Sequence, residues 1–118
     1  MFEEDTGSVV CVADAREVTR IRTACASAVA TEALARRDAE TLAVFGCGTQ
    51  AEAHIRALPL VRTIRRVLVW GRNPDIARDF AQRMREETGL AVAALADPRE
   101  AAREADVICT VTGAATPI

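Results

Sequence analysis

The chain has 118 residues, of which half are apolar and only 3% aromatic, and its formal net charge is −2 at pH 7. This length fits one ordinary domain or part of a larger one, and the weak, mixed charge argues against nucleic acid or a membrane surface as a partner. All 15 basic residues are arginine and tyrosine is absent, which excludes a lysine Schiff base and a phenolic acid on these residues.

The first part of the chain predicts a strand followed by a long helix. The turn residues DTG precede SVVCV, which is typical of a short strand over residues 8–12. Asp14, with Glu17 three residues later, is suited to begin a helix. Apolar residues then recur near a 3.6-residue period over residues 18–37, and glycine and proline are absent there.

From residue 41 onward, apolar strands alternate with amphipathic helices, which predicts a parallel sheet with helices on both faces. Pro59, Pro74, Gly89 and Asp97 mark helix ends or starts. We therefore expect a Rossmann-like α/β fold of about four strands in the order 3-2-1-4, truncated relative to the usual six. The alternative to truncation is that a partner covers the open edge of strand four. The predicted strands are 41–46, 65–71, 90–95 and 106–112, and the predicted helices are 49–58, 74–89 and 97–105.

The turn between the strand at 41–46 and the next helix fits G-x-G-x-x-[GA]. Gly46 would allow the sharp turn, Gly48 would let a pyrophosphate approach the backbone, and Ala51 would let the helix press on the strand. The anion would then lie at the helix N-terminus, beside Thr49 and Gln50. These residues are candidate cofactor-binding residues. A plain tight turn in an alanine-rich chain is the alternative.

The end of the second strand bears on the choice between NAD(H) and NADP(H). An NAD site commonly has an acidic residue there, whereas here Gly71 is followed by Arg72 and Asn73. A guanidinium can pair with the 2′-phosphate and stack on adenine, so NADP(H) is favoured over NAD(H). The alternative is that Arg72 is a solvated loop residue and Asp75 binds the ribose.

The four cysteines and the single histidine do not predict a metal site. The cysteines are widely spaced without a C-x-x-C motif, and free thiols of a cytoplasmic protein are the preferred interpretation. His54 is expected to be a surface or packing residue. The N-terminal MFEED is not typical of a signal peptide, and no apolar segment approaches the roughly 20 residues needed to span a bilayer. We expect a cytoplasmic protein. The cysteines are Cys11, Cys25, Cys47 and Cys109.

Several segments together resemble the ornithine cyclodeaminase/mu-crystallin family. They are the RTA segment on the long alanine-rich helix, the A-x-x-LAR-x-DA lead-in and the GxGxQA turn, all within VTRIRTACASAVATEALARRDAETLAVFGCGTQAEAHIRAL. VLVWGRNPDIARDFA and ADVICTVTGAATPI continue the resemblance over nearly the whole chain. It implies that residues 1–15 are the tail of a substrate and dimerisation domain, 16–40 a long linking helix, and 41–118 a partial NAD(P)-binding Rossmann domain.

The resemblance also implies a function and further site residues. Members of this family are usually dimeric and use NAD(P)(H) on amino acids, imines or ketimines, so a cyclodeaminase or ketimine reductase is implied. Arg22 would lie by the substrate carboxylate and the cofactor. Thr23 and Gln50 would contact the cofactor phosphates, and Val111 and Thr112 would lie near the nicotinamide ribose.

The sequence departs from the family pattern in ways that leave the activity of these 118 residues open. The family's substrate-contacting lysine is absent, and the acidic residue that acts on the substrate lies beyond Ile118. The catalytic residues are therefore unknown, and we expect a fragment that is inactive alone. The alternatives are a non-catalytic, crystallin-like module that binds a dinucleotide or small ligand, and a remnant that folds poorly.

Overall fold

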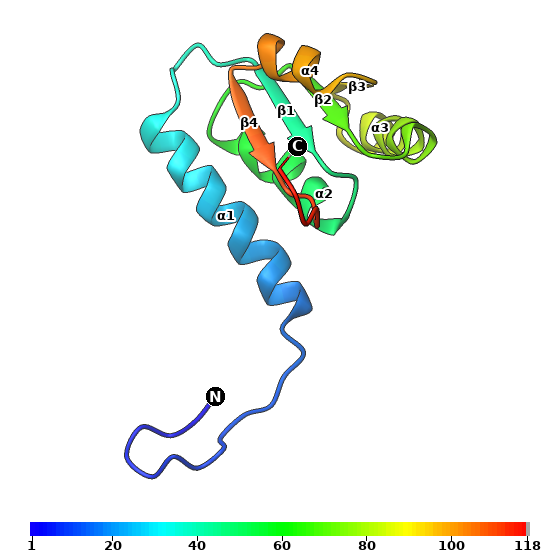
Figure 1. The fold of residues 1–118 in the computed structure, drawn as a ribbon. Helices are drawn as coiled ribbons and strands as arrows, with labels where there is room; N and C mark the ends of the chain where they lie inside the picture. The colour runs from blue at the N-terminus through cyan, green and yellow to red at the C-terminus, as the bar shows by residue number, and fades with distance from the viewer. Residues whose placement is uncertain (118) are drawn as a thin grey trace.

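The computed structural model describes residues 1–117 and contains one parallel sheet with helices on both faces (Figure 1). The strand order β3-β2-β1-β4 confirms the predicted Rossmann-like topology, and all three strand pairs are parallel. The strands are β1 (Thr41–Phe45), β2 (Arg66–Trp70), β3 (Ala91–Ala94) and β4 (Val107–Thr110). The helices are α1 (Arg16–Leu34), α2 (Thr49–Ala57), α3 (Pro74–Thr88) and α4 (Pro98–Glu104), with a 3-10 turn, η1 (Leu58–Leu60), after α2.

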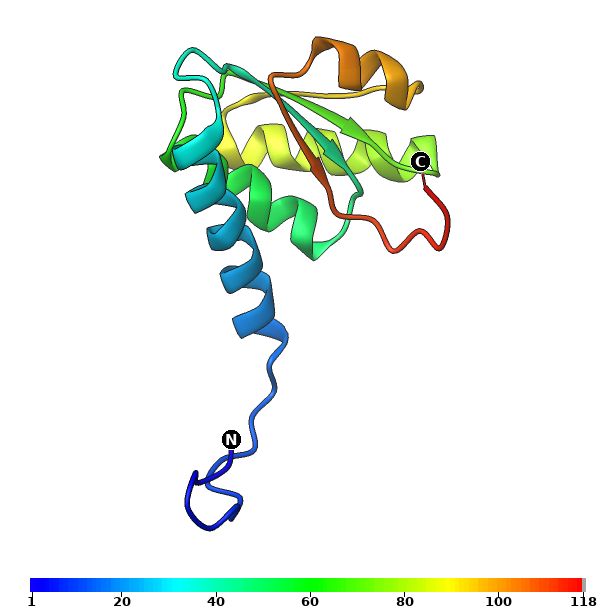
Figure 2. The ribbon, with the colours of Figure 1, turned by 60° about the vertical axis from the view of Figure 1, so that its left-hand side comes forward.

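Strand β1 is buried on both faces, which explains its continuous apolar sequence. Successive side chains point to opposite sides of a strand. Leu42 and Val44 therefore pack with α2 and α3, whereas Ala43 and Phe45 pack with Ala101 of α4. Figure 2 shows α4 on the side of the sheet opposite α2 and α3. This arrangement fixes the carboxyl end of β1 at the centre of the sheet.

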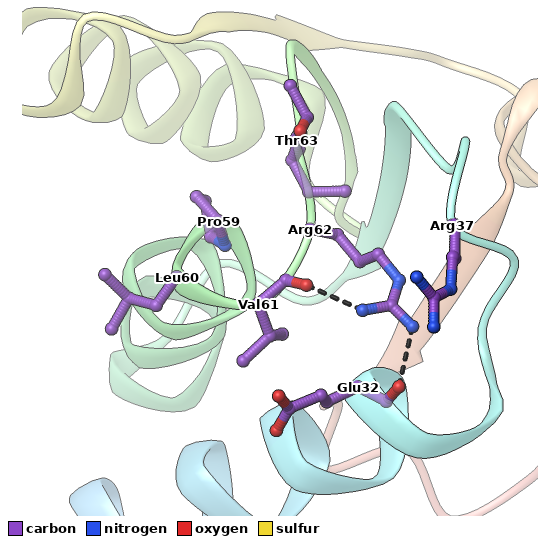
Figure 3. A pocket seen from close by; sticks show the side chains of 8 residues that line it. Glu32, Arg37, Pro59, Leu60, Val61, Arg62 and Thr63 are labelled. Carbon is purple, nitrogen blue, oxygen red and sulfur yellow. Dashed lines mark hydrogen bonds between the residues drawn. The ribbon is translucent and has the colours of Figure 1, made fainter.

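The long helix α1 packs against α2 and ends at Leu34, so the expectation of helix to residue 37, and of a linking helix to residue 40, is wrong. Arg62, which lies beyond η1, binds one carbonyl group of the last turn of α1 and two carbonyl groups just after the helix. The Arg62 guanidinium donates to the carbonyl oxygen of Glu32 at 2.7 Å (Figure 3). It also donates to the carbonyl oxygens of Ala35 (2.9 Å) and Arg36 (3.0 Å). A guanidinium so distant in sequence leaves no local signal of where the helix ends.

Asp106, just before β4, holds the start of β1. Its Oδ2 accepts from the backbone N–H groups of Glu40 and Thr41, each at 3.0 Å, and its Oδ1 pairs with Arg36. The backbone N–H donors, with the nearby guanidinium, lower the pKa of Asp106 from its ordinary value of 3.8. The carboxylate therefore joins the α1–β1 connection to the edge strand.

Residues 8–12 do not form the predicted strand. The only bridge in residues 1–15 is an isolated antiparallel one between Phe2 and Val9. This segment extends away from the sheet (Figure 1), and Val12 is 91% exposed. A strand requires a neighbour along its whole length, and here the backbone pairing is short: Val10 N–H donates to the Met1 carbonyl oxygen at 3.1 Å, and Glu3 N–H donates to the Ser8 carbonyl oxygen at 2.9 Å. The expectation rested on an apolar run after the turn residues DTG, and neither feature supplies a pairing partner.

The caps of the later helices follow the sequence signals. Asn73 caps α3 through its side chain, and α3 ends at Gly89 in a left-handed conformation (φ 72°). Asp97 caps α4 by accepting from the N–H of Arg99 at 2.9 Å. Asp14 instead lies one residue before the N-cap of α1 and accepts from the N–H of Arg16 at 2.9 Å.

Two further observations concern the described part of the chain. Among residues 1–117, no helix combines the length and the apolar character needed to cross a membrane. In the same residues, no group of three or more histidine, cysteine, aspartate or glutamate side chains is placed to hold a metal ion.

Candidate functional site

A groove of about 340 Å³ lies at the carboxyl ends of β1, β2 and β4. In open α/β sheets, ligands bind outside the carboxyl ends of strands where the strand order reverses, and β1 lies at that reversal here. The lining residues come from the three segments after β1, β2 and β4, including the last residue of β2 and the first turn of α3. They are Gly46, Cys47, Gly48, Trp70, Gly71, Arg72, Asn73, Ile76, Val111, Thr112, Gly113 and Ala114.

Gly46 is held in a conformation that excludes other residues. Its φ is +130°, and a Cβ at this position would lie 2.7 Å from the carbonyl oxygen of Val111. Its N–H donates to the carbonyl oxygen of Trp70 at 2.8 Å. The turn after β1 is therefore held between the ends of β2 and β4, and its conformation at position 46 requires glycine.

Gly48, the N-cap of α2, borders open space. Its backbone is extended (φ −100°), no side chain caps the helix, and a Cβ built here would have no atom within 4 Å. The N–H groups in the first turn of α2 therefore have no intrahelical acceptor and no side-chain cap. A glycine cradle before uncapped N–H groups fits a pyrophosphate, which the helix dipole also favours.

The loop after β2 supplies an exposed cation but no carboxylate to this groove. Arg72 is exposed and lines it, whereas Asp75 does not line it and pairs with Arg78. Asn73 lines it too, but its Oδ1 already accepts from the N–H groups of Asp75 (2.9 Å) and Ile76 (3.3 Å). Its acceptor therefore caps α3, which leaves only its amide NH₂ to a ligand.

Cys47 lies within the glycine turn and adds no charge to the groove. Its side chain is half-buried and packs against the core under α2 and α3. Burial raises the pKa of the Cys47 thiol above its ordinary value of 9.0, so the thiol is protonated at neutral pH. A neutral thiol does not repel an anionic ligand.

Thr49 and Gln50 line a different hollow, between the start of α1 and α2. The Gln50 Nε2 donates to the carbonyl oxygen of Thr19 at 3.3 Å, across the two helices. Its Oε1 is buried and has no hydrogen-bond partner among the described residues. The side chain of Gln50 thus contacts α1, and its role toward cofactor phosphates stays a prediction.

The remaining predicted site residues lie outside the groove. Arg22 is exposed on α1, and Thr23 is half-buried on the same helix. Ala51 is fully buried in the core beneath α2, as the helix–strand contact requires. The roles of Arg22 and Thr23 toward substrate and cofactor stay predictions.

His54 is a packing residue between α1 and α2. It is 2% exposed, its Nδ1 lies 2.7 Å from the Gln50 carbonyl oxygen, and its Nε2 lies 2.9 Å from Ser27 Oγ. A carbonyl oxygen only accepts, so Nδ1 donates to it. Both ring nitrogens are occupied within the helix interface.

Sequence reasoning did not select several groove residues. Cys47 lies inside the glycine motif and Trp70 lies in a predicted strand, but neither residue carries a ligand signal of its own. Ile76, Gly113 and Ala114 carry no motif signal, since only the folded loops bring them to the groove.

The chain resembles characterised proteins over nearly all of its length. It is 40% identical over 112 residues to Delta(1)-pyrroline-2-carboxylate reductase of Bacillus cereus, covering 95% of this chain and 34% of that protein. A solved lysine cyclodeaminase that recognises L-lysine, L-ornithine and L-2,4-diaminobutyric acid superposes with a TM-score of 0.85 and 40% identity, over 97% of this chain and 33% of that one.

A Delta(1)-pyrroline-2-carboxylate reductase of Thermococcus litoralis, solved with NADH and L-proline, gives a TM-score of 0.82 and 32% identity, over 92% of this chain and 34% of that one. The chain thus spans about a third of the length of these relatives. A family model matches residues 1–118. The chain therefore belongs to the ornithine cyclodeaminase/mu-crystallin family.

Proposed function

We propose that this chain is the dinucleotide-binding part of an NAD(P)-dependent enzyme that reduces a cyclic imine or deaminates an amino acid. The observation that carries the proposal is the groove where Gly46 locks the turn and Gly48 leaves the N-terminus of α2 open. The relatives support it, since one was solved with NADH and L-proline and another recognises diamino acids.

In this proposal, the residues at the carboxyl end of the sheet hold the cofactor. The N–H groups at the start of α2, with Thr49, would bind the pyrophosphate, and Val111 and Thr112 after β4 would border the nicotinamide ribose. Bound NADPH would supply the hydride. Thr23 and Gln50 are proposed to support the phosphates from α1 and α2.

We propose NADP(H) rather than NAD(H) as the preferred cofactor. Three features of the loop after β2 support this preference: Gly71 carries no carboxylate, Asp75 is paired with Arg78, and exposed Arg72 lines the groove. A guanidinium binds a phosphate through parallel, charge-assisted hydrogen bonds.

The substrate is proposed to be a small amino acid or cyclic imine whose carboxylate pairs with Arg22. The relatives are about three times as long, so we expect acid–base groups and substrate contacts outside residues 1–118. In the whole protein, residues 1–15 would belong to a substrate and dimerisation domain, and residues 16–40 would connect it to the cofactor domain. We expect residues 1–118 alone to bind nucleotide without turnover.

We also propose that the whole protein is a cytoplasmic homodimer. Exposed apolar side chains on α1 support a covered surface in the assembly, notably Val18 at 61% and Val29 at 65% exposure. The four cysteines are free in the structure, which supports a reducing compartment.

A crystallin-like binding module is the second candidate, because the described groove accounts for binding but not for acid–base catalysis. The test is NADPH oxidation by the whole protein with Δ1-pyrroline-2-carboxylate, and NADP⁺ reduction with L-proline. Turnover that Arg22→Ala abolishes supports the enzyme. Saturable nucleotide binding without turnover in either direction supports the binding module.

A further inference from the structure

The glycine turn and the loop after β2 meet at one pair of residues. A Cβ built on Gly71 would lie 2.7 Å from the Cys47 Sγ, closer than real Cβ atoms approach a sulfur. The Gly46 N–H donates to the Trp70 carbonyl oxygen at 2.8 Å, which fixes the separation of the two loops beside this pair. The thiol therefore occupies the space that a side chain at position 71 would require.

The backbone does not demand glycine at position 71. Its φ lies outside the left-handed region, unlike that of Gly46, Gly7 or Gly89. The other nearest atoms to a Cβ are more distant, with Ala77 Cβ at 3.5 Å and the Asn73 carbonyl oxygen at 3.8 Å. The Cys47 sulfur is therefore the one neighbouring atom that a side chain at position 71 would overlap.

Position 71 is where an NAD-binding Rossmann domain commonly has the carboxylate that accepts from the ribose hydroxyls. We propose that Cys47 is a specificity-determining residue: its sulfur excludes a side chain from position 71 and so keeps a carboxylate away from the ribose 2′ position. The proposal rests on the function proposed above. Cys47 thus acts on the adenosine end of the cofactor from within the pyrophosphate turn, and leaves Arg72 as the charged group there.

The steric part is tested by thermal unfolding of the 118-residue chain without nucleotide. Gly71→Ala should lower the melting temperature by about 5–10 °C beside Cys47, because the added methyl overlaps the sulfur. In the Cys47→Ala background the same change should cost less than half as much. Cys109→Ala is the matched control, since Cys109 is also half-buried against this core but is not among the nearest atoms of a Gly71 Cβ. Equal losses in all backgrounds would overturn the proposal.

The specificity part is tested by calorimetric titration of NADPH and NADH into Cys47→Ala and the double variant Cys47→Ala/Gly71→Asp. The added carboxylate should shift the ratio of the two dissociation constants toward NADH by about tenfold or more, because it repels the 2′-phosphate and accepts from the 2′-hydroxyl. If both chains bind with an unchanged ratio, the role of Cys47 is refuted while the proposed function stands. If the wild-type chain, folded by its melting curve, binds neither nucleotide, the proposed function fails and the specificity role fails with it.

Discussion

Replacing Gly48 by valine should abolish dinucleotide binding while leaving the fold intact. The position has an extended backbone with φ −100°, which a β-branched residue adopts, and a Cβ there has no neighbour within 4 Å. A valine side chain would therefore enter the open cradle before α2 without displacing protein atoms. The free energy of unfolding of the Gly48→Val chain should differ from that of the wild-type chain by no more than about 0.5 kcal/mol.

The expected loss of affinity follows from the hydrogen bonds that the cradle offers. A hydrogen bond to a charged group contributes about 1.5–3 kcal/mol, and the valine would keep the pyrophosphate from at least two N–H groups at the start of α2. The loss of about 3 kcal/mol or more corresponds to a dissociation constant raised by more than about 100-fold.

The assay is a calorimetric titration with NADPH, paired with thermal unfolding of the same preparation. Gly46→Ala is the contrasting variant: it meets the Val111 carbonyl oxygen at 2.7 Å with φ +130°, so it should lower the melting temperature by on the order of 10 °C. An unchanged affinity in a stable Gly48→Val chain would refute the placement of the pyrophosphate on this turn.

Three further substitutions test Arg72, Arg62 and Asp106. Arg72→Ala should weaken NADPH binding by about tenfold and NADH binding by less than about twofold, with Arg99→Ala on α4, away from the groove, as the control in the same titration. Equal losses would refute the phosphate assignment. Arg62→Ala should destabilise the chain by about 2–3 kcal/mol in urea unfolding, because it leaves the Glu32, Ala35 and Arg36 carbonyl groups without this donor. Arg65→Ala, which removes a surface ion pair, should cost under about 1 kcal/mol. Asp106→Asn should lower the melting temperature at pH 7. The lowered pKa of Asp106 means that its charge stabilises the fold above 3.8 and is lost as pH falls, so the gap between the two chains should close below 3.8, and a constant gap would refute this role.

The elements that the sequence predicted well carry their own local signals. β1 is buried on both faces and is apolar throughout, Pro74 and Gly89 bound α3, and Asp97 caps α4. The strand order matches the Rossmann order that a glycine turn after the first strand of alternating strands and helices predicts. The candidate cofactor site at the glycine turn could also be predicted, because its strand, turn and helix lie within one short segment.

The features that the sequence did not reveal depend on distant partners. Arg62, from beyond η1, binds the carbonyl groups around the end of α1, and no local sequence signal shows this contact. Residues 8–12 have a strand-like composition, but only an isolated bridge pairs them with another segment. The contact of Cys47 with position 71 joins two loops that only the sheet brings together. The amide of Gln50 contacts Thr19 across two helices, a partner that the motif does not name.

The most direct test of the dinucleotide site is titration of the purified 118-residue chain with NADPH and with NADH by calorimetry. We predict saturable binding of one nucleotide per chain, tighter for NADPH than for NADH, and lost in Gly48→Val. A chain that unfolds cooperatively, yet gives no saturable heat with either nucleotide, would contradict the assignment of the groove at the carboxyl ends of β1, β2 and β4.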